Sequence, residues 1–439
     1  MYQSTRADDH YDVLVIGAGA GGLFAAARLA HHGLRPLVVE RLPKVGGRAS
    51  TTEVDGFLVN DGAIVIEVGG TTEELFDEVG AHFDVRTPNP PVLYRVGKKD
   101  LDATRGGWGM LLSSLTRQGA KLLDGIGAAR KDDDALPEDQ MTTAEWVARY
   151  TNNQAVHGVF RNMCASVFSV GSEELPARVF LTYFTRKSAF KRFGFCPEGT
   201  IGIWRSLASV IERSGGTIWL SSEVEQLHLA DGRVTGATVR RPDERVTVRC
   251  DAALSDIGPA ATLPMLGQDG EDPDYVAEVR RSDHPTAMIT INFASQRALV
   301  DAPGLLLPSK SRRLCYIANF TATCPEMAPP GWNLYCGTSV PKPAVGDFDE
   351  QAELELLRAD LRDQIEGFDE AREISIAVMR GGWPPQRAVA GFDARPRTPI
   401  PNLWNLGDGV KEYASGGTTA CAETARIVTD EVRAVLVAP

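Results

Sequence analysis

The chain has 439 residues, of which 43% are hydrophobic and 24% charged, as in globular proteins that are too long for one simple core. Its 58 acidic and 46 basic side chains give a net charge of −12, which argues against a nucleic-acid partner because an acidic surface repels polyanions. The seven cysteines are scattered, which predicts reduced thiols. The segment 1–10 is polar, in agreement with a cytoplasmic location, and the lack of any apolar run of about 18 residues predicts no transmembrane helix.

Residues 11–40 predict a dinucleotide-binding unit. An apolar strand runs into a glycine turn, a helix of small residues follows, and a second apolar strand ends at Glu40. Glycines in such a turn let the backbone approach a pyrophosphate, the helix N-terminus favours negative charge, and Glu40 can accept hydrogen bonds from ribose hydroxyls. The pattern alone leaves a nicotinamide and a flavin dinucleotide open. The contacts expected in this unit are Gly17, Gly19, Ala20, Gly22, Glu40 and Arg41.

A second glycine turn follows at 46–48, and residues 61–63 read Asp-Gly-Ala before an apolar run. With the first unit, these motifs resemble the flavoprotein superfamily of amine oxidases, phytoene desaturases and protoporphyrinogen oxidases. In that superfamily a G-G-R turn follows the ribose-binding acid, and a D-x-G-A-like element lies beside the flavin ring. Apart from the resemblance, Arg48 can neutralise a pyrophosphate through a forked contact; the alternative is a tight turn with a surface arginine. The resemblance implies FAD contacts at Gly47, Arg48, Gly62 and Ala63.

Residues 70–200 are expected to be mostly helical, and they carry no phosphate or metal motif. The segment 108–126 has a helical period with one apolar face, which favours packing on its own domain over the alternative, a peripheral membrane contact. Four cations lie within 186–192. Such a run of cations is typical of a solvated helix face. The alternative is a clamp for an anionic substrate group, built from Arg178 and Arg186.

Residues 197–275 return to the nucleotide-binding domain, with a helix at 201–214 and strands that follow it. The resemblance implies that the backbone of Val224 contacts adenine. Residues 275–395 contain stretches of period-two apolar alternation, which predict a sheet, and an amphipathic helix at 351–367.

The end of the chain resembles the superfamily's C-terminal flavin signature. An apolar strand at 398–408 ends in Gly-Asp, and a glycine turn leads into a long closing helix. Asp408 can bind ribityl hydroxyls, and the helix N-terminus can stabilise negative charge at the N1–C2=O edge of a reduced flavin. Only Cys421 offers an attachment point near these loops, so FAD is expected to be non-covalent. The contacts expected here are Gly407, Asp408, Thr418 and Thr419.

These motifs together predict an α/β fold with two domains. A Rossmann-type FAD-binding domain is expected from the discontinuous segments 1–70, 197–275 and 396–439. The remaining segments, 71–196 and 276–395, are expected to form a substrate-binding domain with a mixed sheet and helices. The sequence predicts no metal site.

The expected reaction is oxidation of a small molecule, with hydride transfer from a C–H bond to flavin N5. Amine-oxidising members of the superfamily place a lysine on the strand that opens the second substrate segment, which is 288–293 here. No lysine occurs between Lys191 and Lys310. This departure favours a desaturase that introduces a C=C bond into an isoprenoid or an alicyclic ketone or carboxylic acid. The candidate catalytic residues by type are Tyr413, Tyr183 and Tyr316.

Two other functions stay open at this point: an amine oxidase for secondary or cyclic amines, and a non-catalytic flavin-binding protein. Nicotinamide binding conflicts with the C-terminal signature. Dioxygen and quinone are both open as electron acceptors, as is the oligomeric state.

Overall fold

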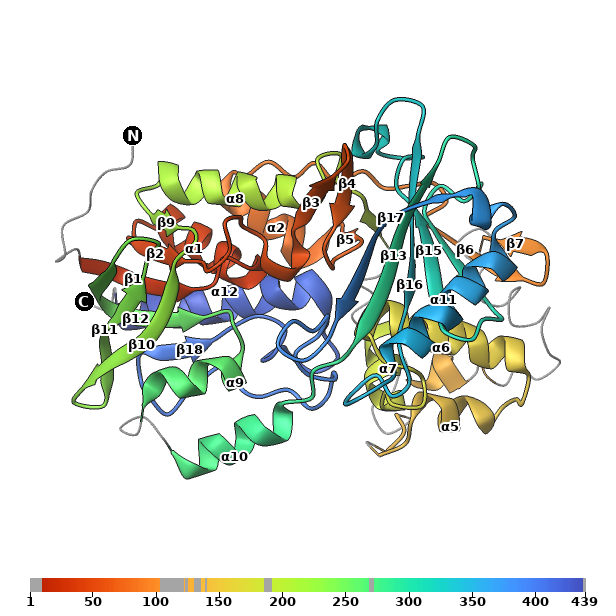
Figure 1. Ribbon diagram of the computed structural model, residues 1–439. Coiled ribbons are helices and arrows are strands. Elements are labelled where there is room, and N and C mark those ends of the chain that lie inside the picture. The colour runs from red at the N-terminus through yellow and green to blue at the C-terminus, as the bar shows by residue number, and fades with distance from the viewer. Residues whose placement is uncertain are drawn as a thin grey trace.

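The computed structural model describes residues 10–102, 122, 125–129, 136–138, 140–184, 192–267 and 272–436. Two lobes lie side by side, each built on its own seven-stranded sheet with helices packed against it (Figure 1). We call the lobe that contains β1 (His10–Ile16) the first lobe, and the lobe that contains β13 (Met288–Ser295) the second lobe. The expected α/β class is confirmed.

Parallel strands form the centre of the first sheet. β1 pairs in parallel with β2 on one side and with β12 on the other, and β9 continues the sheet beyond β2. β10 and β11 form an antiparallel hairpin that pairs with the first half of β12, while β18 runs parallel to its end. The other strands of this sheet are β2 (Pro36–Val39), β9 (Thr217–Trp219), β10 (Glu223–Ala230), β11 (Arg233–Arg240), β12 (Arg245–Ser255) and β18 (Leu403–Asn405).

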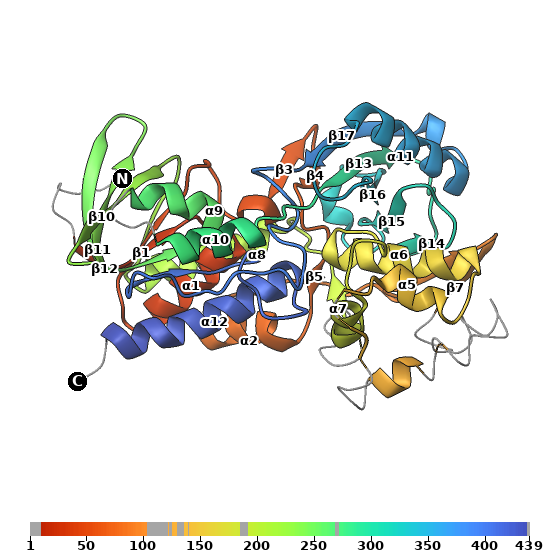
Figure 2. The ribbon, with the colours of Figure 1, turned by 90° about the horizontal axis from the view of Figure 1, so that it is seen from below.

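Both faces of the first sheet are covered, which explains why β1 is apolar at nearly every position. Val13 and Val15 point into a core shared with four helices, and Leu14 and Ile16 point into a second core with the β10–β11 hairpin. Seen from below, α2 and α12 lie side by side (Figure 2). The four helices are α1 (Ala20–His31), α2 (Gly70–Val79), α8 (Ile201–Arg213) and α12 (Gly417–Leu436), and α9 (Pro259–Thr262) and α10 (Pro273–Ser282) follow β12.

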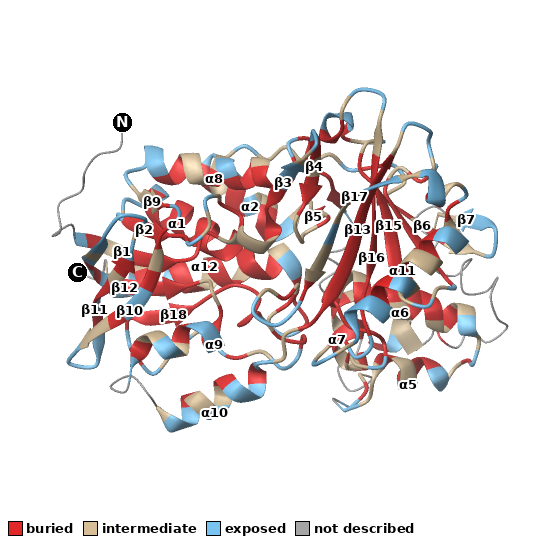
Figure 3. Cartoon of the chain, viewed as in Figure 1, coloured by how far each residue is buried: buried red, intermediate tan, exposed pale blue. Residues whose placement is uncertain are grey.

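The second sheet is mostly antiparallel and has the order β17-β13-β16-β15-β14-β6-β7. Its remaining strands are β6 (Val92–Val96), β7 (Lys99–Leu101), β14 (Leu305–Pro308), β15 (Leu314–Asn319), β16 (Asn333–Ser339) and β17 (Arg372–Met379). Helix α11 (Glu350–Gln364) covers one face, and α5 (Thr143–Ala148), α6 (Gln154–Phe168) and α7 (Ala177–Thr182) lie on the other. The central strands of both sheets are largely buried, whereas β7, β10 and β17 are mostly half-buried or exposed (Figure 3). Two small antiparallel pairs complete the fold: β3 (Thr51–Val54) with β4 (Phe57–Asn60), and β5 (Ile66–Glu67) with β8 (Phe193–Gly194).

Some elements differ from the sequence-based expectation. β6 and β7 lie in the segment expected to be mostly helical, and they extend the second sheet because β6 pairs in parallel with β14. The strand expected over 398–408 is only Leu403–Asn405, since Pro399 and Pro401 cannot donate to a sheet. Helix α2 falls in the segment assigned to the substrate domain, yet it buries Leu75 and Phe76 against the helices of the first lobe.

The apolar segment 108–126, expected to pack on its own domain or to touch a membrane, lies outside the described residues except for positions 122, 125 and 126. Within the described part of the chain, no helix combines the length and the apolarity that are needed to span a bilayer.

The contact between α6 and the second sheet generates a prediction. A β-carbon at Gly158 of α6 would collide with the backbone carbonyl oxygen of Ser309, just after β14. We expect Gly158→Ala to lower the free energy of unfolding by about 1–3 kcal/mol because backbone cannot yield cheaply to the added methyl group. Urea denaturation of the purified protein measures this change.

Gly127→Ala is the matched control. Gly127 also lies in a helical turn, and among the described residues no atom outside its own turn lies within 4 Å of the position of its added β-carbon. The substitution should therefore leave stability unchanged or raise it by up to about 1 kcal/mol. Equal effects of the two substitutions would contradict the close contact of α6 with the sheet.

Candidate active site

The glycine turn lies at the carboxyl end of β1 and leads into α1. Gly17 has φ +98°, which favours glycine, and a β-carbon at Gly22 would collide with the carbonyl oxygen of Gly17. Glu40, at the end of the neighbouring β2, accepts hydrogen bonds from the backbone N–H groups of Ala18 (2.7 Å) and Leu42 (2.8 Å). Burial raises the pKa of Glu40 above its usual value, although both hydrogen bonds oppose the shift. The acid and the turn thus form one buried unit.

A cavity of about 450 Å³ adjoins this unit and is lined by residues of both lobes. From the second lobe it receives Val167 of α6, Met288 of β13, Tyr316 of β15 and Met379 of β17. The expected cofactor contacts Gly22, Gly407 and Thr419 do not line it. The expected contacts that do line it are Gly17, Gly19, Ala20, Glu40, Arg41, Gly47, Arg48, Gly62, Ala63, Val224, Asp408 and Thr418.

Four charged residues meet at one side of the cavity, of which Asp408 is buried and the other three are half-buried: Arg48, Asp256, Arg387 and Asp408. The guanidinium of Arg48 forms a bidentate ion pair with Asp408 and also donates to the carbonyl oxygen of Pro384 at 2.9 Å. Burial disfavours ionisation of Asp408, but the charge of Arg48 prevails and holds its pKa well below the usual value. The forked contact of Arg48 is therefore made to a carboxylate, and its expected contact with a pyrophosphate stays a prediction.

Arg387 was not anticipated from the sequence. Its backbone N–H donates to Asp408 at 2.8 Å, but its side-chain Nε is buried without a hydrogen-bond partner. Burial and then the charge of Arg48 lower the pKa of Arg387 to about 10, so it is charged at neutral pH. Nε lies 4.0 Å from Asp408 Oδ1, which makes an ion pair but no hydrogen bond. A cationic donor that lines a cavity and has no hydrogen-bond partner at Nε fits an anionic ligand group.

Asp256 was also missed. It directly follows β12, and its backbone N–H donates to the carbonyl oxygen of Ile16 at 2.9 Å. Its carboxylate lies against the start of α1, because a β-carbon at Gly19 or Gly21 would collide with it. The available signal was its position at the carboxyl end of a parallel strand, where open α/β sheets bind ligands.

Glu67 is the third residue that sequence reasoning missed. It lies in β5, lines the cavity, and accepts hydrogen bonds from the hydroxyl of Tyr183 (2.8 Å) and from the hydroxyl of Thr419 at the start of α12. Burial raises the pKa of Glu67 to about 7, although the hydrogen bond from Tyr183 opposes the shift. The signal in the sequence was an apolar run, 64–66, that ends in an acid.

The three tyrosines proposed as catalytic residues have different surroundings. Tyr316 lines the cavity, and burial raises its pKa above the usual value. Tyr183 is buried outside the lining, and burial, then the charge of Glu67, raises its pKa. Tyr413 is 43% exposed and does not line the cavity.

The proposed anion clamp is not assembled at the cavity by the described residues. Arg178 is half-buried and does not line the cavity, and Arg186 lies outside the described residues.

None of the described residues that line the cavity is a lysine. Lys411, three residues after Asp408, is buried nearby, but it donates to Asp393 and to the carbonyl oxygens of Ala388 (3.0 Å) and Asp408 (2.9 Å). All three donors of its ammonium group are used within the protein. Lys411 therefore acts as a structural cation.

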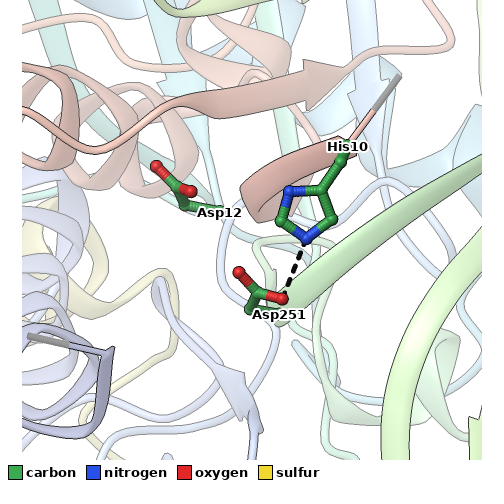
Figure 4. Close-up of side chains that lie close together, drawn as sticks. All are labelled: His10, Asp12 and Asp251. Carbon is green, nitrogen blue, oxygen red and sulfur yellow. Dashed lines mark hydrogen bonds and ion pairs between the residues drawn. The ribbon is translucent and has the colours of Figure 1, made fainter. Parts of the chain in front are cut away.

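Among the described residues, one group of side chains of metal-ligand type occurs away from the cavity, at His10, Asp12 and Asp251 (Figure 4). His10 Nε2 lies 2.9 Å from Asp251 Oδ1, and the backbone N–H of Arg35 donates to Asp12 at 2.6 Å. These contacts account for the grouping of exposed side chains, and the absence of a metal site stays a prediction.

Comparisons with known proteins give the family. The flavin-containing amine oxidoreductase family matches residues 20–432. A neurosporene-forming phytoene desaturase of Cereibacter sphaeroides is 25% identical over an alignment of 265 positions, which covers 54% of this chain and 51% of that curated relative.

Solved structures cover the whole fold. An oxidoreductase from Methanosarcina mazei has a TM-score of 0.85 and 26% identity, over 95% of this chain and 100% of that chain. Cyclohexylamine oxidase from Brevibacterium oxydans IH-35A has a TM-score of 0.64 and 17% identity, over 96% of this chain and 99% of its own, a likeness of fold alone.

The match confirms the resemblance on which the sequence analysis relied. The glycine turn with its paired acid, and the Nε of Arg387 that lacks a hydrogen-bond partner, fit a dinucleotide with an anionic pyrophosphate. The chain belongs to the flavin-containing amine oxidoreductases and is an FAD-dependent oxidoreductase.

Proposed function

We propose that the protein is a desaturase that removes a hydride and a proton from neighbouring carbons of an isoprenoid or an alicyclic ketone or carboxylic acid. The observation that carries this proposal is the cavity lining, which combines apolar side chains and a buried carboxyl group without a lysine among the described residues. Bound FAD supplies the chemistry of hydride acceptance at N5.

The cofactor-binding part of the proposal assigns one role to each buried group. Glu40 binds the adenosine ribose, the N–H groups at the start of α1 bind the pyrophosphate, and the backbone of Val224 binds adenine. Asp408 binds ribityl hydroxyls, and the N-terminus of α12 at Thr418 favours negative charge on the reduced ring. The lining of the cavity by Glu40, Val224, Asp408 and Thr418 supports this assignment.

The proton leaves to Glu67 in this proposal. One C–H bond breaks to release hydride, the electron pair of the neighbouring C–H bond forms the C=C bond, and the carboxylate of Glu67 takes the remaining proton. A carboxyl group with a pKa of about 7 is matched to proton transfer near neutral pH. Tyr183 and Thr419 hold the carboxyl group in place from outside the lining.

The substrate's hydrocarbon part packs against apolar side chains from both lobes. Ile64 and Val65 precede Glu67, and Val167, Met288 and Met379 come from the second lobe. Such a wall excludes water from the reacting carbons and suits the hydrocarbon part of an isoprenoid or alicyclic substrate.

Anaerobic reduction of the purified holoenzyme tests the reaction class. We expect isoprenoid or alicyclic ketone and acid substrates to bleach the flavin absorbance and to yield products with one additional C=C bond. Secondary and cyclic amines, and the primary alicyclic amine cyclohexylamine, should leave the flavin oxidised. Bleaching by amines with none by the hydrocarbon panel would establish amine oxidation instead, and no bleaching by either panel would favour a non-catalytic flavoprotein.

A second prediction concerns Glu67. Its ionised form is the base, and its pKa is raised, so the rate of flavin reduction should rise with pH through about 7. Glu67→Gln should lower this rate by about 10²–10⁴-fold and abolish the rise with pH. Stopped-flow absorbance under anaerobic conditions measures both effects.

Tyr413→Phe is the control for this experiment, because Tyr413 is 43% exposed and does not line the cavity. It should keep the wild-type rate and pH profile. A wild-type profile in Glu67→Gln would remove Glu67 from the mechanism, whereas a slow Tyr413→Phe would restore Tyr413 as a catalytic candidate.

A further inference from the structure

Asp256 places a carboxylate where the cofactor's phosphate groups are expected to bind. The side chain is half-buried, and β-carbons at Gly19, Gly21 or Gly407 would each collide with the carboxylate, which therefore lies against the first turn of α1. An internal anion thus uses the positive end of the helix that anions favour.

The charges around Asp256 balance without the cofactor. Arg48 and Arg387 supply two positive charges, and Asp256 and Asp408 supply two negative charges. The pyrophosphate of FAD adds two further negative charges to the same buried region. The bidentate ion pair with Arg48 keeps Asp408 ionised. Asp256 is therefore the carboxylate that can be neutralised by protonation.

We propose that Asp256 takes up one proton when FAD binds, so that the protein holds its cofactor less tightly as the pH rises. The inference goes beyond the proposed desaturation and rests only on FAD binding in this cavity. A protonated Asp256 removes the repulsion between two anions at one helix N-terminus, and its new O–H can donate to a phosphate oxygen.

The neighbouring groups agree with this assignment. Arg48 precedes β3, Arg387 and Asp408 flank β18, and Cys421 lies on α12. Burial raises the pKa of Asp256 to about 7, while the backbone N–H of Gly22 and the two arginines oppose the shift. Without FAD the group is therefore mostly neutral below about pH 7 and mostly ionised above it, and an added pyrophosphate extends the neutral range upward.

Binding of FAD to cofactor-depleted protein tests the proposal without any catalytic assay. Fluorescence titration should show that affinity falls about tenfold between about pH 6 and about pH 8, as expected for one proton taken up by a group with a pKa near 7. Calorimetry in two buffers with different ionisation enthalpies, at about pH 8, should show uptake of close to one proton per FAD. Affinity independent of pH, or no proton uptake, would overturn the proposal.

Variants identify the group. Asp256→Asn should bind FAD as tightly at about pH 8 as the wild type does at about pH 6, and without proton uptake. Glu67→Gln and Cys421→Ser are the controls, because Glu67 and Cys421 also line the cavity, and both variants should keep the wild-type pH dependence. A wild-type pH dependence in Asp256→Asn, or its loss in either control, would contradict the assignment to Asp256.

Failure of the variant to fold and failure of the proposed function can each be distinguished from failure of this proposal. If Asp256→Asn does not fold, wild-type calorimetry and the two control variants still decide whether a proton is taken up and whether another group takes it. Failure of the folded wild type to bind FAD at any pH would overturn the proposed function as well. Binding with a flat pH profile would overturn the proton uptake alone.

Discussion

The buried ion pair between Arg48 and Asp408 is the constraint on which the site depends. Its partners come from the two ends of the chain, 360 residues apart. Two charges removed from water destabilise a fold unless their geometry and remaining hydrogen bonds are good. Here the carboxylate also accepts from the backbone of Arg387, and the guanidinium also donates to a carbonyl oxygen, so both ions are compensated. The N-terminal and C-terminal motifs must therefore assemble together.

The same pair brings the second lobe to the site. Residues 382–387 follow β17 of the second sheet and carry Arg387 to the first lobe, where its backbone contacts Asp408. The cavity is consequently formed by both lobes, and each lobe supplies both polar and apolar residues to its lining.

Much of the first lobe could be predicted because its signals are local. The turn at Gly17 and the acid at Glu40 lie within one strand-helix-strand unit, where spacing alone indicates the fold. Asp256 and Glu67 carry only a weak local signal, an acid at the end of an apolar run, and Arg387 carries none, so each becomes informative only when distant segments meet. Tyr183 was chosen by residue type, and its hydroxyl instead contacts Glu67. Residue type alone does not indicate whether a side chain reaches the cavity, as the exposed Tyr413 illustrates.

Lys411 has a consequence for how the substrate range of this enzyme can change. Its ammonium group joins Asp393 and the carbonyl oxygen of Ala388 to the backbone of Asp408. These contacts hold the loop just beyond Arg387 against the Gly-Asp motif that ends at Asp408. Mutations in this loop would therefore disturb cofactor binding before they altered substrate selectivity. The apolar side chains of β13 and β17 that line the cavity make no such contacts with this motif. Their identities can therefore change more freely between relatives that share the same oxidising cofactor.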